Sequence, residues 1–374
     1  MNFTIGKEIM LNNLLVSQKA LSTKTPAPYL QGIKLDVFQN EIVLITSNAD
    51  IAIKLSIKDD SLNVESTGSA LIPGKYFVEI IRKLDGDKLA VSMLDNNMLR
   101  IVAGNSDVTL NMLNVDDYPD LEFRVVDNPI KIDAKVMRAV IRQTTFAASM
   151  IENRPILTGV NIKVDGQKLI AIATDSFRLS QKFIDIPTNF ERMNVVIPAK
   201  SLDELGKVLE SNLDEILIHL DAKSILFEYG NVLFQSRLLE GNFPETSRLI
   251  PIEFPIVIKF NKNDLFVAVE RAALLSSREG SASIVKLHLR TDNVVEITSN
   301  SPEIGKVSEE VFPIEKAIGT TIKIAFSSKY FLDALKTFQS DQVYVKFTGE
   351  IRPFVLEGEA DPGLIQLILP VRTE

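Results

Sequence analysis

The feature that most constrains this chain is a short phrase that occurs twice, Lys-Tyr-Phe followed by an aliphatic and an acidic residue. The two copies begin at Lys75 and Lys329, 254 residues apart, and a looser copy begins at Lys200, close to their midpoint. Repetition at one period of 127 residues predicts three modules of one design. Modules of this kind build surfaces more often than they build active sites.

Other segments keep the same offset, as a true duplication requires. A short strand pattern recurs at residues 3–5, 130–132 and 258–260, at steps of 127 and 128. Each copy is followed by a residue type that can begin a helix, either by capping the first turn or by bending freely. These residues are Gly6, Asp133 and Asn261.

Each module is also doubled internally. The strand-then-helix opening returns at residues 71–75, 195–200 and 324–329. We therefore expect an α+β fold, in which every module consists of two β-α-β-β-β halves with both helices on one side of antiparallel sheets. Turn-forming and charged residues interrupt the pattern twice. The predicted modules are residues 1–125, 126–252 and 253–374.

Composition restricts the class of protein. The chain is 45% apolar, so each module can bury a core of its own. No apolar run approaches the roughly 18 to 20 residues of a membrane span, and no basic region precedes an apolar one at the N-terminus. The chain has no cysteine, which removes disulfides and thiolate sites. We expect a cytoplasmic protein that is neither exported nor inserted in a membrane.

Residues suited to catalysis are scarce. His219 and His288 each lie in an alternating strand pattern, where a solvent-facing histidine without a catalytic role is expected. Gly74 and Lys75 resemble the end of a phosphate loop, but no glycine precedes them at the required spacing and Tyr76 replaces the serine or threonine. Acidic residues occur singly or in surface pairs, which favours solvated charge over a metal or carboxylate site. We predict no enzymatic activity, no cofactor and no metal.

Charge is distributed unevenly along the chain. The whole sequence carries −8, whereas the six predicted helical segments together carry +6, so the remainder carries −14. Helices often collect lysine as surface residues, which is the simplest explanation. The repeat, however, places the helices on one side of their sheets and concentrates the positive charge, which suits a polyanion held along one lining. The six predicted helical segments whose charges are summed are residues 7–20, 75–84, 134–147, 200–210, 262–275 and 329–338.

The segment 134–147 indicates what kind of contact this would be. Its Lys135, Arg138 and Arg142 form one helical stripe without interleaved aromatic residues, and the chain has no tryptophan. Contact with phosphates, independent of base sequence, is expected. A few charges bind weakly at physiological salt. Weak contact of this kind suits a protein that slides along a nucleic acid while its shape retains it.

Five segments resemble one known family. They are residues 1–5, 154–160, 173–179, 238–244 and 369–372, which read MNFTI, RPILTGV, ATDSFRL, LLEGNFP and LPVR. In these segments and in its threefold repeat, the chain is similar from first residue to last to the bacterial sliding clamps, the β subunits of DNA polymerase III. One departure is Phe177, where many members carry histidine.

The resemblance implies a homodimer, in which two chains of three modules close head to tail into a six-module ring around duplex DNA. Helices would line the inside of this ring and sheets its outside, and the ring would tether the replicative polymerase and other proteins. The repeat itself favours closure, because units with complementary ends either close or polymerise. By the resemblance, the dimer contact uses Val108, Leu110, Leu274 and Leu275, each of which could instead belong to the core of its own module.

A second implied site is a partner groove between modules 2 and 3. There the polymerases, the clamp loader and repair proteins of the family insert a short peptide with hydrophobic anchors. The apolar residues 369–371 support a binding surface independently, because free termini are ordinarily polar. Apolar walls with arginines at the rim suit such a peptide, although the leucines could be ordinary core and the arginines ordinary surface residues. The matching positions are Leu157, Thr174, Asp175, Arg178, Leu179, Pro244, Arg248, Leu249, Leu369, Pro370, Val371 and Arg372.

The resemblance and the helical charges together nominate contacts with double-stranded DNA. In the family, the loop that corresponds to residues 22–26 reaches into the ring. Singly, each cation is more often plain surface charge, so the prediction concerns the set. The candidates are Lys24, Lys75, Arg82, Lys135, Arg138, Arg142, Lys200 and Lys329.

Two other classes of function are compatible with the sequence. One is a hydrolase with its site around Asp175, completed by Arg178 and His288 after folding. The other is a repeat scaffold that binds only proteins, which explains the modules and the apolar tail but not the basic helices. A ring on circular DNA is retained until the circle is cut, whereas neither alternative predicts this behaviour.

Overall fold

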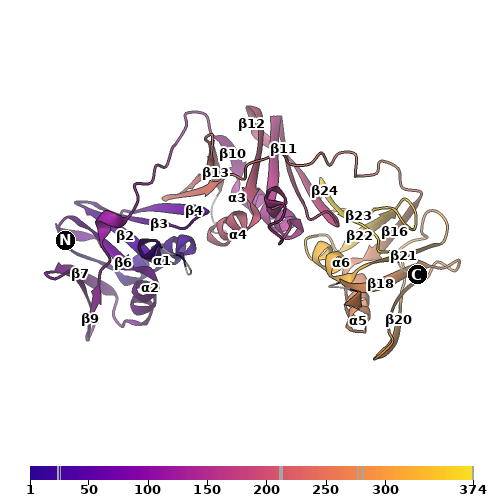
Figure 1. Cartoon of the computed structure of the whole chain (residues 1–374), viewed down its shortest axis with the longest axis horizontal. Coiled ribbons are helices and arrows are strands. Elements are labelled where there is room, and N and C mark those ends of the chain that lie inside the picture. The colour runs from indigo at the N-terminus through magenta and orange to yellow at the C-terminus, as the bar shows by residue number, and fades with distance from the viewer. Residues whose placement is uncertain (23–24, 26, 210–213, 276–277, 280–281, 373–374) are drawn as a thin grey trace. The chain divides into compact units, whose positions relative to one another are not determined.

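The computed structural model of this chain describes residues 1–22, 25, 27–209, 214–275, 278–279 and 282–372. The chain divides into two compact units, whose residues can be found by the colour scale of Figure 1. Unit 1 comprises residues 1–137 and 201–238, and unit 2 comprises residues 138–200 and 239–374. The division falls inside helices α3 (Ala134–Thr144) and α4 (Ala199–Val208).

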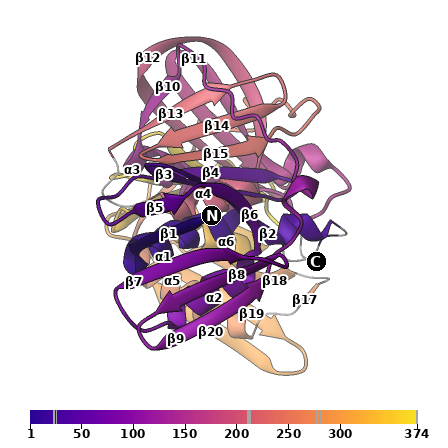
Figure 2. The same cartoon turned by 90° about the vertical axis from the view of Figure 1, so that its left-hand side faces the viewer.

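The described residues of unit 1 form a five-stranded antiparallel sheet with the order β5-β1-β7-β8-β9 and an eight-stranded one with the order β10-β13-β14-β15-β4-β3-β2-β6. Figure 2 shows β13, β14, β15, β4 and β3 of the larger sheet one after another. The helices and strands are α1 (Lys7–Ser17), α2 (Gly74–Lys83), β1 (Asn2–Gly6), β2 (Gly32–Phe38), β3 (Glu41–Ser47), β4 (Ile51–Ile57), β5 (Asn63–Ser66), β6 (Gly68–Pro73), β7 (Lys88–Leu94), β8 (Met98–Ala103), β9 (Ser106–Asn111), β10 (Ile130–Asp133), β13 (Glu215–Leu220), β14 (Ser224–Tyr229) and β15 (Val232–Arg237).

The described residues of unit 2 form a six-stranded antiparallel sheet with the order β11-β12-β24-β23-β22-β16. A second sheet has the order β17-β18-β19-β20, and β21 also pairs with β18. The helices and strands are α5 (Lys262–Leu274), α6 (Ser328–Leu335), β11 (Gly159–Thr174), β12 (Arg178–Pro198), β16 (Ile256–Asn261), β17 (Arg278–Glu279), β18 (Ala282–Leu289), β19 (Val295–Ser301), β20 (Gly305–Val311), β21 (Ile322–Ser327), β22 (Gln342–Phe347), β23 (Phe354–Gly358) and β24 (Leu364–Ile368).

The helices that follow the repeated strands begin where the sequence predicts. Asp133 Oδ1 accepts hydrogen bonds from the backbone N–H groups of Lys135 and Val136, at 2.7 and 3.0 Å, and so caps α3. Asn261 caps α5 in the same way, and Gly6 stands at the start of α1 without a side-chain cap. These contacts satisfy N–H groups that have no partner inside the helix.

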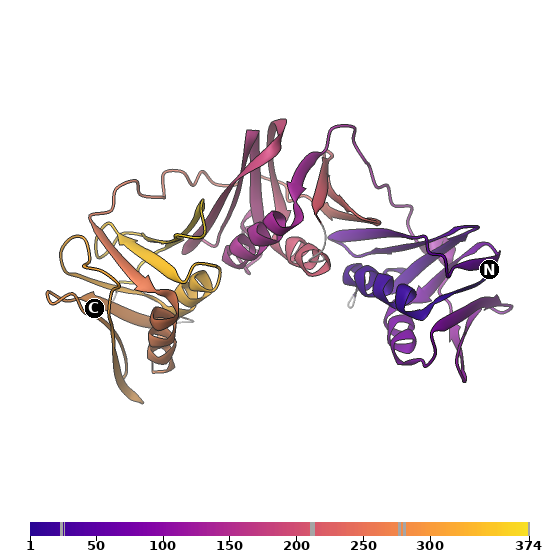
Figure 3. The ribbon, with the colours of Figure 1, turned by 180° about the vertical axis from the view of Figure 1, so that it is seen from behind.

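The two helices of module 1 pack against each other, as do the two helices of module 3. Figure 3 shows α1 and α2 side by side, in indigo and purple. Each helix buries some apolar side chains completely, for example Leu14 and Phe77, and this burial is the main source of stability for such short helices. None of the described helices combines the length and the apolar character that a membrane span needs.

Module 2 differs from the expected pattern of separate short strands. Residues 160–164 belong to β11, with 16 residues, and residues 195–197 belong to β12, with 21. The segment 173–179 contains the turn that joins these two long strands. The register of this hairpin shifts on both sides of Gly166, whose φ of 63° is accessible to glycine. The irregularity lets one continuous ribbon replace the last strand of one half and the first strand of the next.

Sheets also continue across the predicted module boundaries. In unit 1, β15 pairs antiparallel with β4, and Phe234 lies opposite Ile53. In unit 2, the first residues of β12 pair antiparallel with β24, and Leu179 lies opposite Leu367. Within each unit, neighbouring modules are therefore joined edge to edge by strand pairing.

The prediction that His219 faces solvent is wrong. Its side chain is 1% exposed, its Nδ1 accepts a hydrogen bond from the backbone N–H of Val126 at 3.1 Å, and its Nε2 lies 2.9 Å from a carboxylate oxygen of Glu228. Because Nδ1 is an acceptor, Nε2 carries the proton and donates to Glu228. The segment that links modules 1 and 2 covers the sheet face that an isolated strand pattern assigns to water.

Candidate partner-binding site

Four hydrogen bonds from two side chains fix the turn between β11 and β12. Asp175 Oδ1 accepts from the backbone N–H groups of Phe177 and Arg178, at 2.9 and 3.0 Å. Thr174 Oγ1 donates to the carbonyl of Arg178 at 2.6 Å and accepts from the N–H of Ser176. Ser176 has a φ of 78°, in the left-handed region. These bonds hold the turn rigidly while Phe177 projects from it, 61% exposed.

Arg178 is buried, contrary to the expectation that arginines lie at the rim of the site. Its guanidinium donates to Asp175 at 3.1 Å, to Asp333 at 2.9 Å and to the carbonyl of Phe146 at 2.5 Å. It also lies between the rings of Phe146 and Tyr330, 5.0 and 4.6 Å from their centroids. A guanidinium with partners on every side positions its neighbours and is not offered to a ligand.

Tyr330 connects this cluster to the surface. Its ring stacks on that of Phe177, with centroids 6.5 Å apart and an interplanar angle of 23°. Burial raises the pKa of Tyr330, and the nearby negative charge of Asp175 raises the pKa further. The hydroxyl therefore stays protonated and neutral at physiological pH, so the stacked pair presents an uncharged aromatic surface.

The predicted tail residues lie beside this turn. The backbone N–H of Leu369 donates to the carbonyl of Phe177 at 2.9 Å, and that of Val371 donates to the carbonyl of Ala325 at 2.8 Å. Leu369, Pro370 and Val371 are half-buried. The tail thus continues the β12–β24 pairing past the end of β24. We call the surface formed by the β11–β12 turn, Tyr330 and residues 369–371 the tail site.

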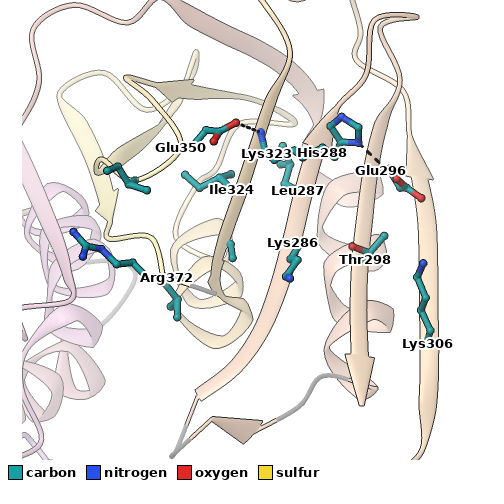
Figure 4. Close-up of a pocket in the computed structure, with 13 residues that line it drawn as sticks. Lys286, Leu287, His288, Glu296, Thr298, Lys306, Lys323, Ile324, Glu350 and Arg372 are labelled. Carbon is teal, nitrogen blue, oxygen red and sulfur yellow. Dashed lines mark hydrogen bonds and ion pairs between the residues drawn. The ribbon is translucent and has the colours of Figure 1, made fainter. Parts of the chain in front are cut away.

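The remaining candidates lie at different depths. Leu179 is buried in a small apolar cluster with Ile172, Val355 and Leu367, against which residues of the segment 243–254 pack. Pro244, Arg248 and Leu249 of this segment are exposed, Leu249 by 52%. Leu157 is buried in the 3₁₀ turn Pro155–Thr158. Arg372 is exposed and lines a cavity with Val371 (Figure 4).

This arrangement suits binding rather than catalysis. Both carboxylate oxygens of Asp175 already accept hydrogen bonds, and His288 is paired with Glu296 at 3.8 Å. Within the described part of the chain, no three His, Asp or Glu side chains are grouped so as to hold a metal. The exposed apolar side chains of Phe177 and Leu249 can instead receive the anchors of a short peptide.

The DNA candidates lie on several helices. Lys75 and Arg82 are exposed on α2, and Arg82 pairs with Glu79 of the same helix at 2.6 Å. Arg138 is half-buried, and Lys24 lies outside the described residues. The other candidates are exposed, on α3, α4 and α6: Lys135, Arg142, Lys200 and Lys329. Their action as a set stays a prediction.

The dimer candidates lie on one edge strand and at one helix end. Val108 and Leu110 are half-buried on β9, which forms an edge of its sheet. Leu274 ends α5 and is 76% exposed, whereas Leu275, just beyond it, is half-buried.

Sequence reasoning missed the residues that enclose Arg178. Phe146, Tyr330 and Asp333 come from segments far from the β11–β12 turn, and no local pattern pairs them with it. Tyr330 and Asp333 do belong to the repeated phrase that begins at Lys329, so their recurrence was the available signal.

Comparison with known proteins gives a consistent result. Models of the DNA polymerase III beta subunit match the N-terminal domain at residues 1–122, the central domain at 131–245 and the C-terminal domain at 247–372. The beta sliding clamps of Staphylococcus aureus and Staphylococcus epidermidis are 41% and 40% identical to this chain, with 100% of both sequences covered. The crystal structure of the DNA polymerase sliding clamp from Bacillus subtilis is 38% identical, covers 100% of both chains and gives a TM-score of 0.95. The chain therefore belongs to the family of the DNA polymerase III beta subunit, the bacterial sliding clamps, and shares its α+β fold of three domains.

Proposed function

We propose that two copies of this chain close into a ring around duplex DNA and tether a DNA polymerase to it. The chain would act as a processivity factor without an active site of its own, in the cytoplasm, where the DNA lies. Membership of the sliding clamp family over the whole length carries the proposal. The strand edges, the basic helices and the tail site each support one part of it.

The pattern of strand junctions supports a head-to-tail dimer. β4 and the first residues of β12 close the first halves of modules 1 and 2, and β15 and β24 close the second halves of modules 2 and 3. At each junction within the chain, the strand that closes the first half of one module pairs with the strand that closes the second half of the next module: β4 with β15, and β12 with β24. The same rule pairs β20 of module 3 with β9 of module 1, and both strands are sheet edges among the described residues. β9 belongs to the first module and β20 to the last, so a second copy of the chain can supply the partner strand for each of them.

The repeat also supplies the register of this contact. β9 and β15 both follow a Gly-Asn turn and are offset by 126 residues, and β4 and β20 are offset by 254. Transferring the β15–β4 register through these offsets predicts the interchain pairs. They are Ser106 with Glu309, Asp107 with Ser308, Val108 with Val307, Thr109 with Lys306, and Leu110 with Gly305.

The helices offer a surface to DNA, and the tail site offers a surface to a protein partner. Exposed cations on α2, α3, α4 and α6 can contact phosphates without reading the base sequence, in a chain that is otherwise acidic. Phe177 and the half-buried tail of the tail site, together with the exposed Leu249, offer apolar surface to a short peptide of the polymerase, the clamp loader or a repair protein.

Retention on a nicked circular plasmid tests the proposal. The chain is loaded with a clamp loader and ATP, the plasmid is isolated by gel filtration, and half of it is then linearised. A ring elutes with the circle and leaves the linear DNA by sliding off its ends. A scaffold that binds only proteins never elutes with DNA, and an ordinary DNA-binding protein stays on both forms. Either result would contradict the proposal.

A further inference from the structure

A cavity of about 690 Å³ lies beside the tail, over the sheet that contains β18, β19, β20 and β21 (Figure 4). Lys286, Lys306 and Lys323 line it together with Arg372 of the tail, and all four side chains are exposed. The cavity lies wholly within unit 2, and it shares Val371 with the tail site but does not include the turn that carries Phe177.

These four cations make no ion pair with any described residue. Lysines on two other strands of the same unit, β16 and β22, are paired with glutamates. Lys259 pairs with Glu359 at 2.7 Å, and Lys346 pairs with Glu357 at 2.6 Å. An unpaired basic cluster is unusual in a chain of net charge −8, and its charges repel one another until an anion binds.

The two carboxylates of the cavity are held by other groups. Glu296 accepts a hydrogen bond from the hydroxyl of Ser308 at 2.7 Å and lies 3.8 Å from His288. Glu350 accepts from the backbone N–H of Lys323 at 3.4 Å. Glu296 is also attracted to Lys306, so the carboxylates offset part of the positive charge without forming an ion pair with any of the four cations. A phosphate backbone has no N–H group that could bond to these carboxylates and would only be repelled by them. The carboxylates can still accept hydrogen bonds from the N–H groups of a peptide.

The cavity also has apolar walls. Ile351 is 70% exposed at its border, Val371 is half-buried, and Leu287, Ile324 and Ala325 are buried beneath it. A ligand that is charged throughout would leave this surface uncovered, whereas one apolar side chain among acidic ones would cover it.

We propose that this cavity binds an acidic segment of a partner protein that carries one apolar side chain. Carboxylates of the segment pair with Lys286, Lys323 and Arg372, and its apolar side chain packs against Ile351 and Val371. The idea that the partner is a protein tethered at the adjacent tail site rests on the proposed function. The chemistry of the cavity does not depend on it.

Fluorescence anisotropy with a labelled Glu-Glu-Leu-Glu-Glu peptide tests the proposal. The cavity variant combines Lys286→Glu with Lys323→Glu, and the control variant combines Lys88→Glu with Lys316→Glu, two exposed lysines outside the cavity. Both variants change the net charge equally. Lys306 is kept because β20 is the proposed dimer edge, and Arg372 is kept because it adjoins the tail site.

We expect the cavity variant to bind the peptide at least tenfold more weakly than the unaltered chain, and the control variant to stay within twofold of it. A Gln-Gln-Leu-Gln-Gln peptide should bind as weakly as the glutamate peptide binds the cavity variant. Equal losses in both variants, or equal binding of both peptides, would overturn the proposal. So would a twelve-base-pair duplex that binds more tightly than the peptide and loses affinity in the cavity variant alone, because the site would then serve nucleic acid.

Retention on the nicked circle separates this proposal from the clamp function. We expect the cavity variant to be retained as the unaltered chain is, while it fails to bind the peptide. If the unaltered chain is not retained, the clamp function fails, and the peptide result still decides the role of the cavity.

Discussion

The two strand junctions inside the chain, β15–β4 and β12–β24, differ from the open edge strands β9 and β20 in the bonds that their side chains make. At the β15–β4 junction, the side-chain amide of Asn231 donates to the carbonyl of Ser56 at 2.6 Å. At the β12–β24 junction, Lys182 Nζ donates to the carbonyl of Pro362 at 2.8 Å. Side chains at these two junctions therefore bond across them and add to the backbone ladder.

Acidic side chains on the open edges are paired within their own units, whereas Lys306 of β20 makes no ion pair with a described residue. Asp107 of β9 pairs with Arg100 of β8 at 2.5 Å, and Glu310 of β20 pairs with Arg290 at 2.7 Å. Charged residues on an exposed edge oppose indiscriminate pairing with other chains. The difference indicates that strand pairing serves two purposes. Within the chain it joins modules permanently, and between chains it would form a contact that can close and reopen around DNA.

The substitution Thr109→Pro should have the largest effect, because it alters the open edge of β9. β8 and β9 are joined by a two-residue turn, so the hydrogen-bonding alternation directs the N–H of Thr109 to the open side of β9. Proline there removes that donor without disturbing the β8–β9 ladder. We expect dimer affinity to fall by roughly 100-fold or more, an amount equivalent to about 2.7 kcal/mol.

Light scattering after gel filtration measures this effect. The variant should elute with a mass near 41.6 kDa at concentrations where the unaltered chain has twice that mass. Thr109→Val is the matched control, since it keeps the N–H and favours a strand. A dimeric proline variant would show that β9 is not the interchain edge.

The closed β12–β24 junction depends on the buried arginine at its end. Arg178 lies opposite Ile368 in the register, and replacing it with methionine leaves Asp175 and Asp333 without their cation. We expect the free energy of unfolding to fall by about 3 kcal/mol in a denaturant titration. The exposed Arg248→Met should change stability by less than about 0.5 kcal/mol. Equal losses in the two variants would contradict the role given to Arg178.

The basic helices should matter less than the junctions, because the ring retains DNA by enclosing it. Alanine at Lys75, Arg138 or Arg142 alone should change little. All three together should shorten the retention time on nicked circular DNA several-fold and reduce its dependence on salt. Dimer mass should not change. Unaltered retention and salt dependence in the triple variant would remove the electrostatic part of the account.

The smallest effect is expected for Asn231→Ala. The loss of its bond across the closed β15–β4 junction should lower the free energy of unfolding by about 1 kcal/mol and leave dimerisation unchanged. Asn105→Ala changes the equivalent residue of the Gly-Asn turn before β9 and is the matched control. A stability loss of the same size in both variants would mean that the turn, and not the junction, accounts for the effect.

The sequence predicted the features that repeat and missed those that depend on distant segments. The strand before α3 and its cap at Asp133 recur at a fixed offset, and so the periodicity located them. The burial of His219 depends on Val126, 93 residues earlier in the chain, and no strand pattern contains that information. The enclosure of Arg178 likewise depends on Asp333, so a surface arginine was expected where the structure has a buried one.

Cysteine crosslinking across the proposed interchain edge tests whether β9 and β20 join two copies of the chain into a ring. The chain has no cysteine, so Val108→Cys with Val307→Cys introduces a single possible disulfide at each contact between copies. This pair is predicted to be of the non-hydrogen-bonded kind, with Cα atoms about 4.5 Å apart, which a disulfide can span. Val108→Cys with Glu310→Cys, displaced by three residues, is the control.

After loading on a nicked circle and oxidation, the account predicts a closed covalent ring that withstands strong salt and detergent and leaves only when the DNA is linearised. The control should not crosslink. An oxidised dimer that washes off the intact circle, or the failure of the Val108 and Val307 pair to crosslink while the control does, would contradict the account.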